Sequence, residues 1–217
     1  MGDRVLTADR GERENLAAFL ARAVRLDEAA VVRLRQRDDT HLVAWAATGF
    51  EALAARVVAG LIRPQDTVVA ADGLLGALHA GDEVDPGYAM DSAWRGALPP
   101  DEGYVHVDDV PAAALIELAR QGAEVAAEHG GPKGPPASLL AQEVLAVDGG
   151  GEHVVVSMRT VFALAAMGFV PGADTETAAV DPAELVRVRA SRTWLRLDAR
   201  YGSVFARRGG EIPISVL

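Results

Sequence analysis

The stretch that sets the first expectation about the fold is 29–60, AAVVRLRQRDDTHLVAWAATGFEALAARVVAG, because a later stretch, 141–172, AQEVLAVDGGGEHVVVSMRTVFALAAMGFVPG, follows it position by position. Each stretch indicates two strands around a polar turn and then a helix that begins near a threonine and ends near a glycine. The identical aligned pairs include Val32 and Val144, His41 and His153, Val43 and Val155, Thr48 and Thr160, Phe50 and Phe162, Ala54 and Ala166, Val58 and Val170, and Gly60 and Gly172. We therefore expect an internal duplication.

Hydrophobic periodicity outside these stretches indicates more helices and strands. A spacing of three and four residues between apolar positions predicts helices, and strict alternation predicts strands. The expected helices are 11–25, 50–61, 72–78, 111–129, 137–142 and 159–167, and the expected strands are 30–35, 42–47, 67–71, 185–190, 193–199 and 203–207, with a hairpin around 148–151. The predicted fold class is α+β, with two pseudo-repeated helix–hairpin–helix halves and a mainly antiparallel sheet.

The Gly/Pro-rich loop 130–136 is the strongest break in the chain, so we expect halves at 1–129 and 137–217 within one compact unit. The first half contains a segment, 81–109, that lacks periodicity and carries eight acidic residues against one arginine, Arg95. Its large apolar side chains are too numerous for a free linker. We expect this acidic segment to pack against the body of the protein, in the manner of a lid.

Composition excludes several kinds of chemistry. The chain has 217 residues, of which 50% are hydrophobic, so it is long and apolar enough to bury a substantial core. It contains no cysteine, which excludes disulfides, thiolate metal sites and cysteine nucleophiles. Lys133 is the single lysine and lies in the Gly/Pro-rich loop, a poor setting for Schiff-base chemistry. No cofactor is expected.

Apolar stretches are too short to cross a bilayer, and the charged N-terminal residues do not form a signal or transit peptide. We therefore expect a cytoplasmic protein with no membrane partner. The formal net charge of −10 indicates that nucleic acid is an improbable partner, because phosphate neutralisation needs a basic face. However, residues 185–208 hold seven arginines against Asp198 alone.

Those arginines form the first candidate site. Val186 and Val188 alternate with arginines on one predicted strand, and the next strand repeats the pattern, so like charges lie side by side. The candidate ligand-binding residues are Arg187, Arg189, Arg196, Arg200, Trp194 and Tyr201. Either the acidic segment or a second subunit supplies the counter-charges, or guanidinium groups bind a phosphorylated or carboxylate ligand or a short nucleic-acid segment.

A second candidate site consists of carboxylates and histidines in and near the acidic segment. They are residue types that bind Zn, Mn or Mg: His79, Asp82, Glu83, Asp85, His106, Asp108 and Asp109. Their spacing matches neither the zincin pattern nor a calcium loop. The alternatives are therefore a solvated acidic loop and a metal-assisted hydrolase, and no metal site is assigned.

Other motifs are weaker. His41 and His153 occupy equivalent places in the two similar stretches, which is compatible with a paired site or with two half-exposed strand residues. No serine lies in a Gly-x-Ser-x-Gly elbow. Gly149, Gly150 and Gly151 lack the following Lys-Ser/Thr of a phosphate-binding loop, and a hairpin turn explains them better.

Three motifs carry a resemblance to a known group: WRGALPP at 94–100 followed by Gly103 and Tyr104, AMGF at 166–169, and WLRL at 194–197 with YGSV at 201–204. Over its last two thirds the chain resembles a family of uncharacterised proteins from high-GC Gram-positive (actinobacterial) bacteria. The resemblance implies a bacterial cytosolic protein and assigns no site residue.

Taken together, these patterns predict a cytosolic binding protein that catalyses no reaction and recognises an acidic protein or a small anionic ligand through the arginine-rich strands. One alternative is the metal-assisted hydrolase that uses residues 81–109. The other is a homodimeric structural protein whose oppositely charged surfaces pair across a twofold axis.

Overall fold

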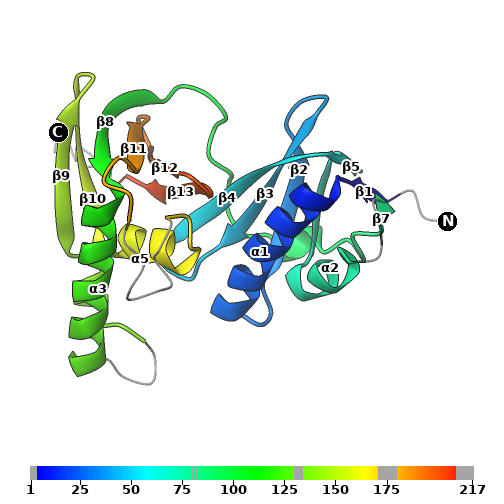
Figure 1. Ribbon diagram of the computed structural model, residues 1–217, viewed down its shortest axis with the longest axis horizontal. Helices are drawn as coiled ribbons and strands as arrows, with labels where there is room; N and C mark the ends of the chain where they lie inside the picture. Colours follow the sequence, from blue (N-terminus) through cyan, green and yellow to red (C-terminus); the bar gives the residue numbers. More distant parts are fainter. Residues whose placement is uncertain (1–3, 80, 82, 130–133, 171–179, 209–217) are drawn as a thin grey trace, which may run out of the picture.

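An eight-stranded antiparallel sheet forms the centre of the protein in the computed structural model, which describes residues 4–79, 81, 83–129, 134–170 and 180–208. The strand order is β6 (Asp66–Ala70), β2 (Val31–Gln36), β3 (His41–Ala47), β4 (Ala52–Ala59), β13 (Gly202–Arg207), β12 (Trp194–Ala199), β11 (Leu185–Ala190) and β8 (Val105–Pro111). Four strands come from the first part of the chain and four from the later part. The two sets join where β4 pairs with β13, so one sheet runs through the molecule (Figure 1).

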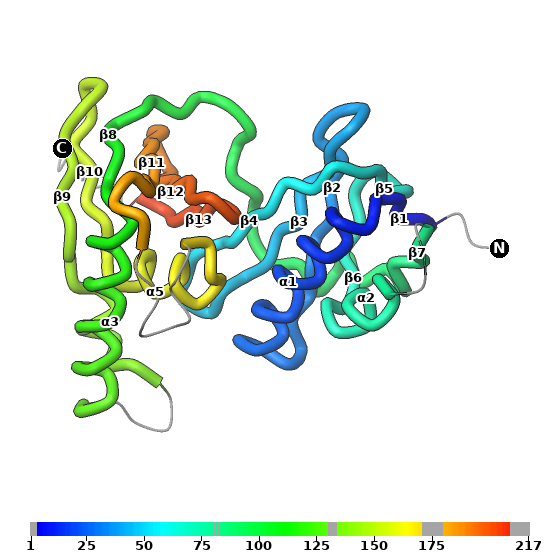
Figure 2. Tube along the Cα trace, in the orientation of Figure 1, coloured from blue at the N-terminus to red at the C-terminus, as the bar shows by residue number. Residues whose placement is uncertain are grey.

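Two small sheets lie at opposite ends of the long axis of the molecule (Figure 2). One contains β5 (Leu61–Arg63), β1 (Val5–Thr7) and β7 (Glu83–Val84), in the order β5-β1-β7. The other is the hairpin of β9 (Glu143–Gly149) and β10 (Glu152–Ser157). The protein is therefore a central sheet with a short sheet beyond each half.

The helices gather on one face of the large sheet (Figure 1). They are α1 (Arg10–Leu26), α2 (Ala71–Ala77), α3 (Ala112–His129), the short α4 (Ala137–Leu140) and α5 (Met158–Ala166). Helix α1 begins where predicted, because the Asp9 side chain accepts a hydrogen bond of 2.9 Å from the Glu12 backbone N–H and caps the first turn. We call the face that the helices cover the helical face and the opposite one the open face.

The main core lies between the large sheet and these helices. Leu34 and Leu42 project from β2 and β3 into it and are fully buried, and Val188 and Leu197 do the same from β11 and β12. Phe19 of α1 stacks on Phe169, with ring centroids 6.2 Å apart. Burial of this continuous apolar layer is the dominant stabilising term, at about 25 cal/mol for each Å² of apolar surface removed from water.

The predicted helix–hairpin–helix form of the duplication is wrong. Residues 50–61 were expected to form a helix like the one predicted at 159–167, but they form strand β4 and the start of β5, whereas the later segment is helix α5. Alanine-rich β4 lies between β3 and β13 and satisfies its backbone on both sides, so tertiary pairing overrides helix propensity. Helix–hairpin–helix halves are therefore absent from the described structure, and a large antiparallel sheet with few helices takes their place.

Other predicted elements match. The hairpin of β2 and β3, strand β6, helices α1, α2 and α3, and strands β11, β12 and β13 all lie within a few residues of their expected bounds. Most of the Gly/Pro-rich loop 130–136 falls outside the described residues. The division into halves 1–129 and 137–217 stays a prediction.

Residues 85–104, which we call the connector, cross the open face between the two sets of strands (Figure 1). Leu98 and Tyr104 of the connector pack on a small apolar cluster built around Trp45 and Phe205. The connector also contains the short 3-10 helix η1 (Asp91–Ala93), next to the edge strand β6. There the Val68 N–H donates to the Asp91 carboxylate at 2.9 Å, and the Val68 carbonyl accepts from the Met90 N–H at 2.8 Å.

The other edge strand, β8, is approached by the tip of the β9–β10 hairpin. A Cβ atom added at Gly149 would come within 1.9 Å of the Val107 carbonyl oxygen, and one at Gly150 within 2.5 Å of the His106 carbonyl oxygen. Only glycine allows two backbones to come so close. This close approach explains two of the three consecutive glycines in the turn.

Candidate functional site

Strand alternation places a second, smaller apolar cluster on the open face. Val43, Trp45 and Ala55 project from β3 and β4, and Trp194 and Phe205 project from β12 and β13. The Trp45 and Phe205 ring centroids are 5.0 Å apart. These side chains are almost completely buried by one another and by the connector, so the exposed groups of this face are mostly polar.

Arginine is the dominant charged residue of the open face. Each of these arginines that lies on a strand follows or precedes a buried residue, so the alternation directs its side chain to the opposite side of the sheet. They are Arg33 and Arg35 of β2, Arg37 of the next turn, Arg187 and Arg189 of β11, Arg196 of β12 and Arg207 of β13. The strands contribute three aspartates to the same face: Asp66, Asp109 and Asp198.

One cluster lies on β2. Arg33 donates two hydrogen bonds to the Asp66 carboxylate, at 2.7 and 2.6 Å, and this contact raises the pKa of the guanidinium. Arg35 approaches Asp101 of the connector only to 3.9 Å, with both side chains largely exposed. Arg37 has no acidic partner among the described residues. The first cluster is therefore one firm ion pair with two weakly engaged guanidinium groups beside it.

A second cluster surrounds Asp198 on β12. The Asp198 carboxylate accepts from Arg196 Nε at 2.6 Å and from Ser203 Oγ at 2.5 Å, and Arg189 Nε lies 3.4 Å away. Arg189 and Arg196 stand directly opposite each other on paired strands, as the like-charge pattern predicted. The Asp198 carboxylate contacts both guanidinium groups and so reduces the repulsion between them. Arg187, at the outer end of this cluster, reaches Asp109 only at 3.9 Å.

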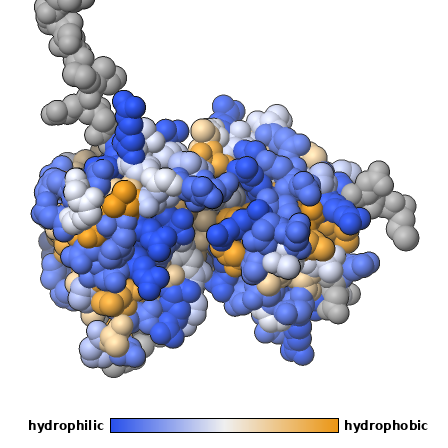
Figure 3. Space-filling view, turned by 90° about the horizontal axis from the view of Figure 1, so that it is seen from above, coloured by the Kyte–Doolittle hydropathy of each residue, from blue (hydrophilic) through white to orange (hydrophobic). Residues whose placement is uncertain are grey.

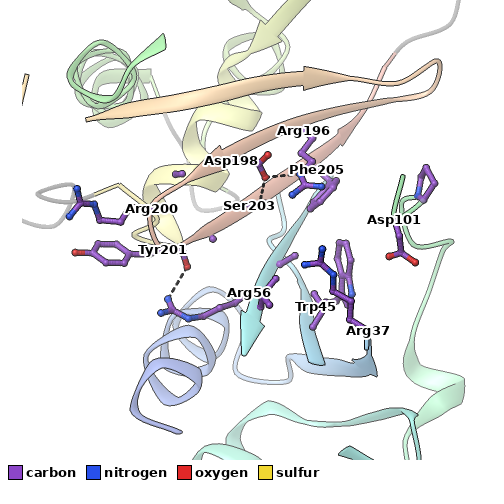
Figure 4. A pocket seen from close by; sticks show the side chains of 16 residues that line it. Arg37, Trp45, Arg56, Asp101, Arg196, Asp198, Arg200, Tyr201, Ser203 and Phe205 are labelled. Carbon is purple, nitrogen blue, oxygen red and sulfur yellow. Dashed lines mark hydrogen bonds and ion pairs between the residues drawn. The ribbon is translucent and has the colours of Figure 1, made fainter. Parts of the chain in front are cut away.

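A cavity of about 300 Å³ lies between the two clusters (Figure 4). Trp45 and Phe205 form part of its wall, Arg37 and Asp101 lie to one side, and Arg196 lies beside Phe205. The Arg196 guanidinium lies 5.2 Å from the Phe205 ring centroid and 5.6 Å from that of Tyr104. Burial raises the pKa of Tyr104 to about 12, so its hydroxyl stays protonated at neutral pH. The cavity has charged sides and an aromatic wall.

The predicted ligand-binding residues separate into three groups. Arg196, Arg200 and Tyr201 line the cavity, whereas Arg187 and Arg189 lie farther along the open face. Arg200 is held by Glu184 at 2.5 Å, a contact that raises its pKa. Trp194 is only 5% exposed and stacks beneath Arg207 at 4.3 Å.

Sequence reasoning missed the half of this surface that β2 contributes. Val32 and Leu34 alternate with Arg33 and Arg35, which is the signal that identified the arginines at 185–208. The alternation at 30–35 predicted a strand and was not assigned to a binding surface, because acidic residues nearby lower the local net charge. Trp45 and Phe205 gave no sequence signal, since only the pairing of β4 with β13 brings them together.

The second predicted site is not assembled. Within the described residues there is no group of three or more histidine, aspartate or glutamate side chains able to hold a metal ion, and Asp82 lies outside the described residues. His106 instead binds Asp109 at 3.0 Å. His41 and His153 belong to different sheets and bind the aspartates of their own turns, Asp38 and Asp148. Hydrogen bonds from Thr40 and His41 hold the pKa of the Asp38 carboxyl below its usual range.

Most of the face seen in Figure 3 is hydrophilic, and its apolar side chains gather in separate patches. Among the described helices, none has the length and apolar character that a bilayer crossing requires.

Comparison with solved structures identifies the fold as that of DNA polymerase sliding clamps. The chain is similar to the β sliding clamp of C. crescentus (TM-score 0.59, 13% identity, 97% of this chain and 66% of the clamp). It is also similar to the sliding clamp of Bacillus subtilis (TM-score 0.58, 12% identity, 98% of this chain and 66% of the clamp). A putative DNA polymerase III β subunit from Eubacterium rectale is similar as well, with a TM-score of 0.57 and 12% identity, over 97% of this chain and 66% of that protein. The chain thus spans about two thirds of the length of these proteins.

The chain belongs to the family described as "Domain of unknown function (DUF8185)", whose model matches residues 99–211. Residues 1–96 match a second model, "Domain of unknown function (DUF8010)". No curated protein matches the chain. The resemblance to an uncharacterised family is confirmed at this level.

These similarities correct the functional predictions. A sliding-clamp fold overturns the prediction of a binder of acidic proteins or small anions, together with its metal-assisted hydrolase alternative. It also contradicts the prediction that nucleic acid is an improbable partner. That prediction failed because net charge is an average over the whole surface and does not show how charge is placed.

Proposed function

We propose that this protein is a clamp-like scaffold that acts on duplex DNA. One observation carries the proposal: the similarity to sliding clamps covers 97% of the chain, so it includes the continuous sheet and both small sheets. A similarity confined to one helix–sheet unit would leave function open, because a common fold hosts many functions. Here it is the whole arrangement of the two parts that is shared.

Holding DNA while sliding along it favours enclosure over a grip on individual phosphates, and in this proposal several copies together form the enclosure. The small sheets lie at opposite ends of the molecule, and an unpaired strand edge can accept a strand from another chain (Figure 2). Glu143 and Asp148 of β9 are exposed at one end, and Arg63 of β5 is exposed at the other. These opposite charges favour head-to-tail contact between copies, which closes into a ring when the rotation permits.

Engineered cysteines test this closure, and the native chain has none to interfere. Ala146→Cys on β9 and Leu61→Cys on β5, the strand that carries Arg63, place one exposed thiol at each end. With a short bis-maleimide, the double variant is expected to give a closed cross-linked oligomer that stays on a nicked circular plasmid through gel filtration and leaves once the plasmid is linearised. Each single variant is the control, because it cannot form a closed covalent ring.

Equal retention of the cross-linked protein on circular and linear DNA contradicts enclosure. A monomer without cross-links at every concentration contradicts it as well. Binding to neither plasmid rejects the DNA scaffold itself.

The proposal also includes a cytoplasmic location, where DNA is accessible in a bacterium, and an actinobacterial source. The sequence resemblance at 94–104, 166–169 and 194–204 supports both.

A further inference from the structure

The large sheet separates at one end of the strand pair that joins its two parts. Strand β4 pairs with β3 from Leu53 to Ala59, whereas its pairing with β13 ends at Ala55 opposite Ser203. Beyond that point the cavity of about 300 Å³ lies between β4 and the turn that precedes β13, and Val57 of β4 is 46% exposed. In the described structure, four residue pairs therefore join β4 to β13.

Arg56 reaches across this gap. It alternates with Ala54 and Val58, which are fully buried on the helical face, so its side chain lies on that face. Its guanidinium donates to the Tyr201 carbonyl at 2.8 Å (Figure 4). Burial lowers the pKa of the guanidinium, and the charge of Glu12 on α1 partly offsets this effect. An apolar side chain would avoid the loss of hydration but could not join the two parts.

The backbone of Tyr201 is also held by Phe169. The Tyr201 N–H donates to the Phe169 carbonyl at 3.2 Å. The buried Phe169 ring packs against the next residue, Gly202, where an added Cβ atom would come within 2.5 Å of the ring. Phe19 of α1 stacks on the same ring. The turn before β13 therefore meets the first part of the chain through its backbone and through Phe169.

Helix α1 takes part at both ends of this set of contacts. Glu12 and Phe19 are seven residues apart, about two helical turns, so they lie on the same side of α1. The Glu12 carboxylate also accepts from the Ala59 N–H at 3.2 Å, at the end of β4 that extends beyond β13. We call the closed set of contacts the latch circuit: Glu12, Arg56, the Tyr201 backbone, Phe169 and Phe19.

Other polar contacts between the two parts lie away from the gap. Arg159 of α5 pairs with Glu51, which precedes the opposite end of β4. Arg25 of α1 donates to the Ala166 carbonyl at 3.2 Å, at the end of α5. Because Arg159 keeps the paired end of β4 in place, a rotation about the β4–β13 pair would open the sheet at Arg56.

We propose that the latch circuit fixes the angle between the two parts of the sheet, and that the loss of Arg56 releases them to hinge about the β4–β13 pair. This inference goes beyond the proposed function and holds whether or not the protein binds DNA.

The distance between the two small sheets reports this angle. Leu61→Cys on β5 and Ala146→Cys on β9 carry spin labels, and the labelled chain is diluted with unlabelled protein so that distances between copies do not contribute. Pulsed electron paramagnetic resonance is recorded without DNA for this reference, for Arg56→Met and for the matched control Arg10→Met, because Arg10 contacts Glu14 within α1. Thermal melts check that each variant is folded.

The reference and the Arg10→Met control are expected to give one narrow distance distribution, and Arg56→Met a broader one with a shifted mean. Arg56→Lys keeps a charge and a donor, so it should restore part of the narrow distribution. Glu12→Gln removes the charge that faces Arg56 and should broaden the distribution less than Arg56→Met does.

An unchanged distribution in folded Arg56→Met protein overturns the inference. Equal broadening in the Arg10→Met control overturns it as well, because a general softening of the fold would then explain both. If Arg56→Met does not fold, Glu12→Gln decides, and a distribution as narrow as that of the reference rejects the latch. None of these outcomes affects the proposed function, since neither DNA nor a ring enters the measurement.

Discussion

The two faces of the central sheet are held in different ways. The helical face is a continuous apolar layer in which Leu34, Leu42 and Val188 are fully buried. The open face has a small aromatic cluster, paired arginines and a connector held by few side chains. Burial of apolar side chains stabilises a fold strongly and needs no particular orientation, whereas exposed ion pairs stabilise it weakly. The helical face therefore supplies most of the stability, and the open face is free for binding.

The largest effect is expected from a cavity on the helical face. Leu34→Ala removes a fully buried side chain from β2 and is expected to lower the free energy of unfolding by about 2–5 kcal/mol. Leu61→Ala on β5, where the leucine is 42% exposed, is the matched control and should cost well under half of that. Denaturant titration measures both. Equal losses would show that the helical face is not the main source of stability.

An intermediate effect is expected where the connector meets the open face. Trp94 is half-buried, its indole N–H has no hydrogen-bond partner among the described residues, and the Arg33 guanidinium lies 6.0 Å from its ring centroid. Trp94→Ala is expected to lower the free energy of unfolding by about 1–2 kcal/mol and to speed protease cleavage within 85–104. Tyr88→Ala, at a side chain 94% exposed, should change neither. Unchanged cleavage in the Trp94 variant would mean that other contacts hold the connector.

The smallest effect separates firm from loose ion pairs. Arg33→Gln removes a two-bond contact with Asp66 and is expected to cost about 0.5–1 kcal/mol, because the pair is partly exposed. Arg35→Gln removes only the 3.9 Å approach to Asp101 and should be close to neutral. Thermal melts at low and high salt measure the difference. A larger cost for Arg35 would show that this arginine is held more firmly than its 3.9 Å approach to Asp101 indicates.

Local patterns allowed most strands and helices to be predicted, because amphipathic periodicity reports which face of each element is buried. The fold was missed at one segment, 50–61, whose alanines and spaced apolar residues satisfy a helix as well as a strand. Strand β13, from far along the chain, decides the outcome by pairing with β4. Such pairing leaves no local trace in a single sequence.

Only part of the candidate site could be predicted, because local patterns show which face a side chain occupies but not which strands pair. Arginines that alternate with valine or leucine mark the open face in both places; the pattern at 185–197 predicted a binding surface, whereas the one at 32–35 predicted only a strand. The cavity could not be predicted from the sequence, because Trp45 and Phe205 come together only where β4 pairs with β13.

The covered edge strands of the central sheet, β6 and β8, affect how readily the protein aggregates at high concentration. An exposed edge strand offers a row of free amides and carbonyls on which another chain can add, the first step toward aggregation. At β6 the Val68 amide and carbonyl are already occupied by Asp91 and Met90, and at β8 the Gly149–Gly150 turn fills the approach. Replacing either glycine would push the hairpin away and uncover β8. Gly149 and Gly150 therefore protect β8 against the addition of strands from other chains. The two small sheets stay free for a specific contact between copies.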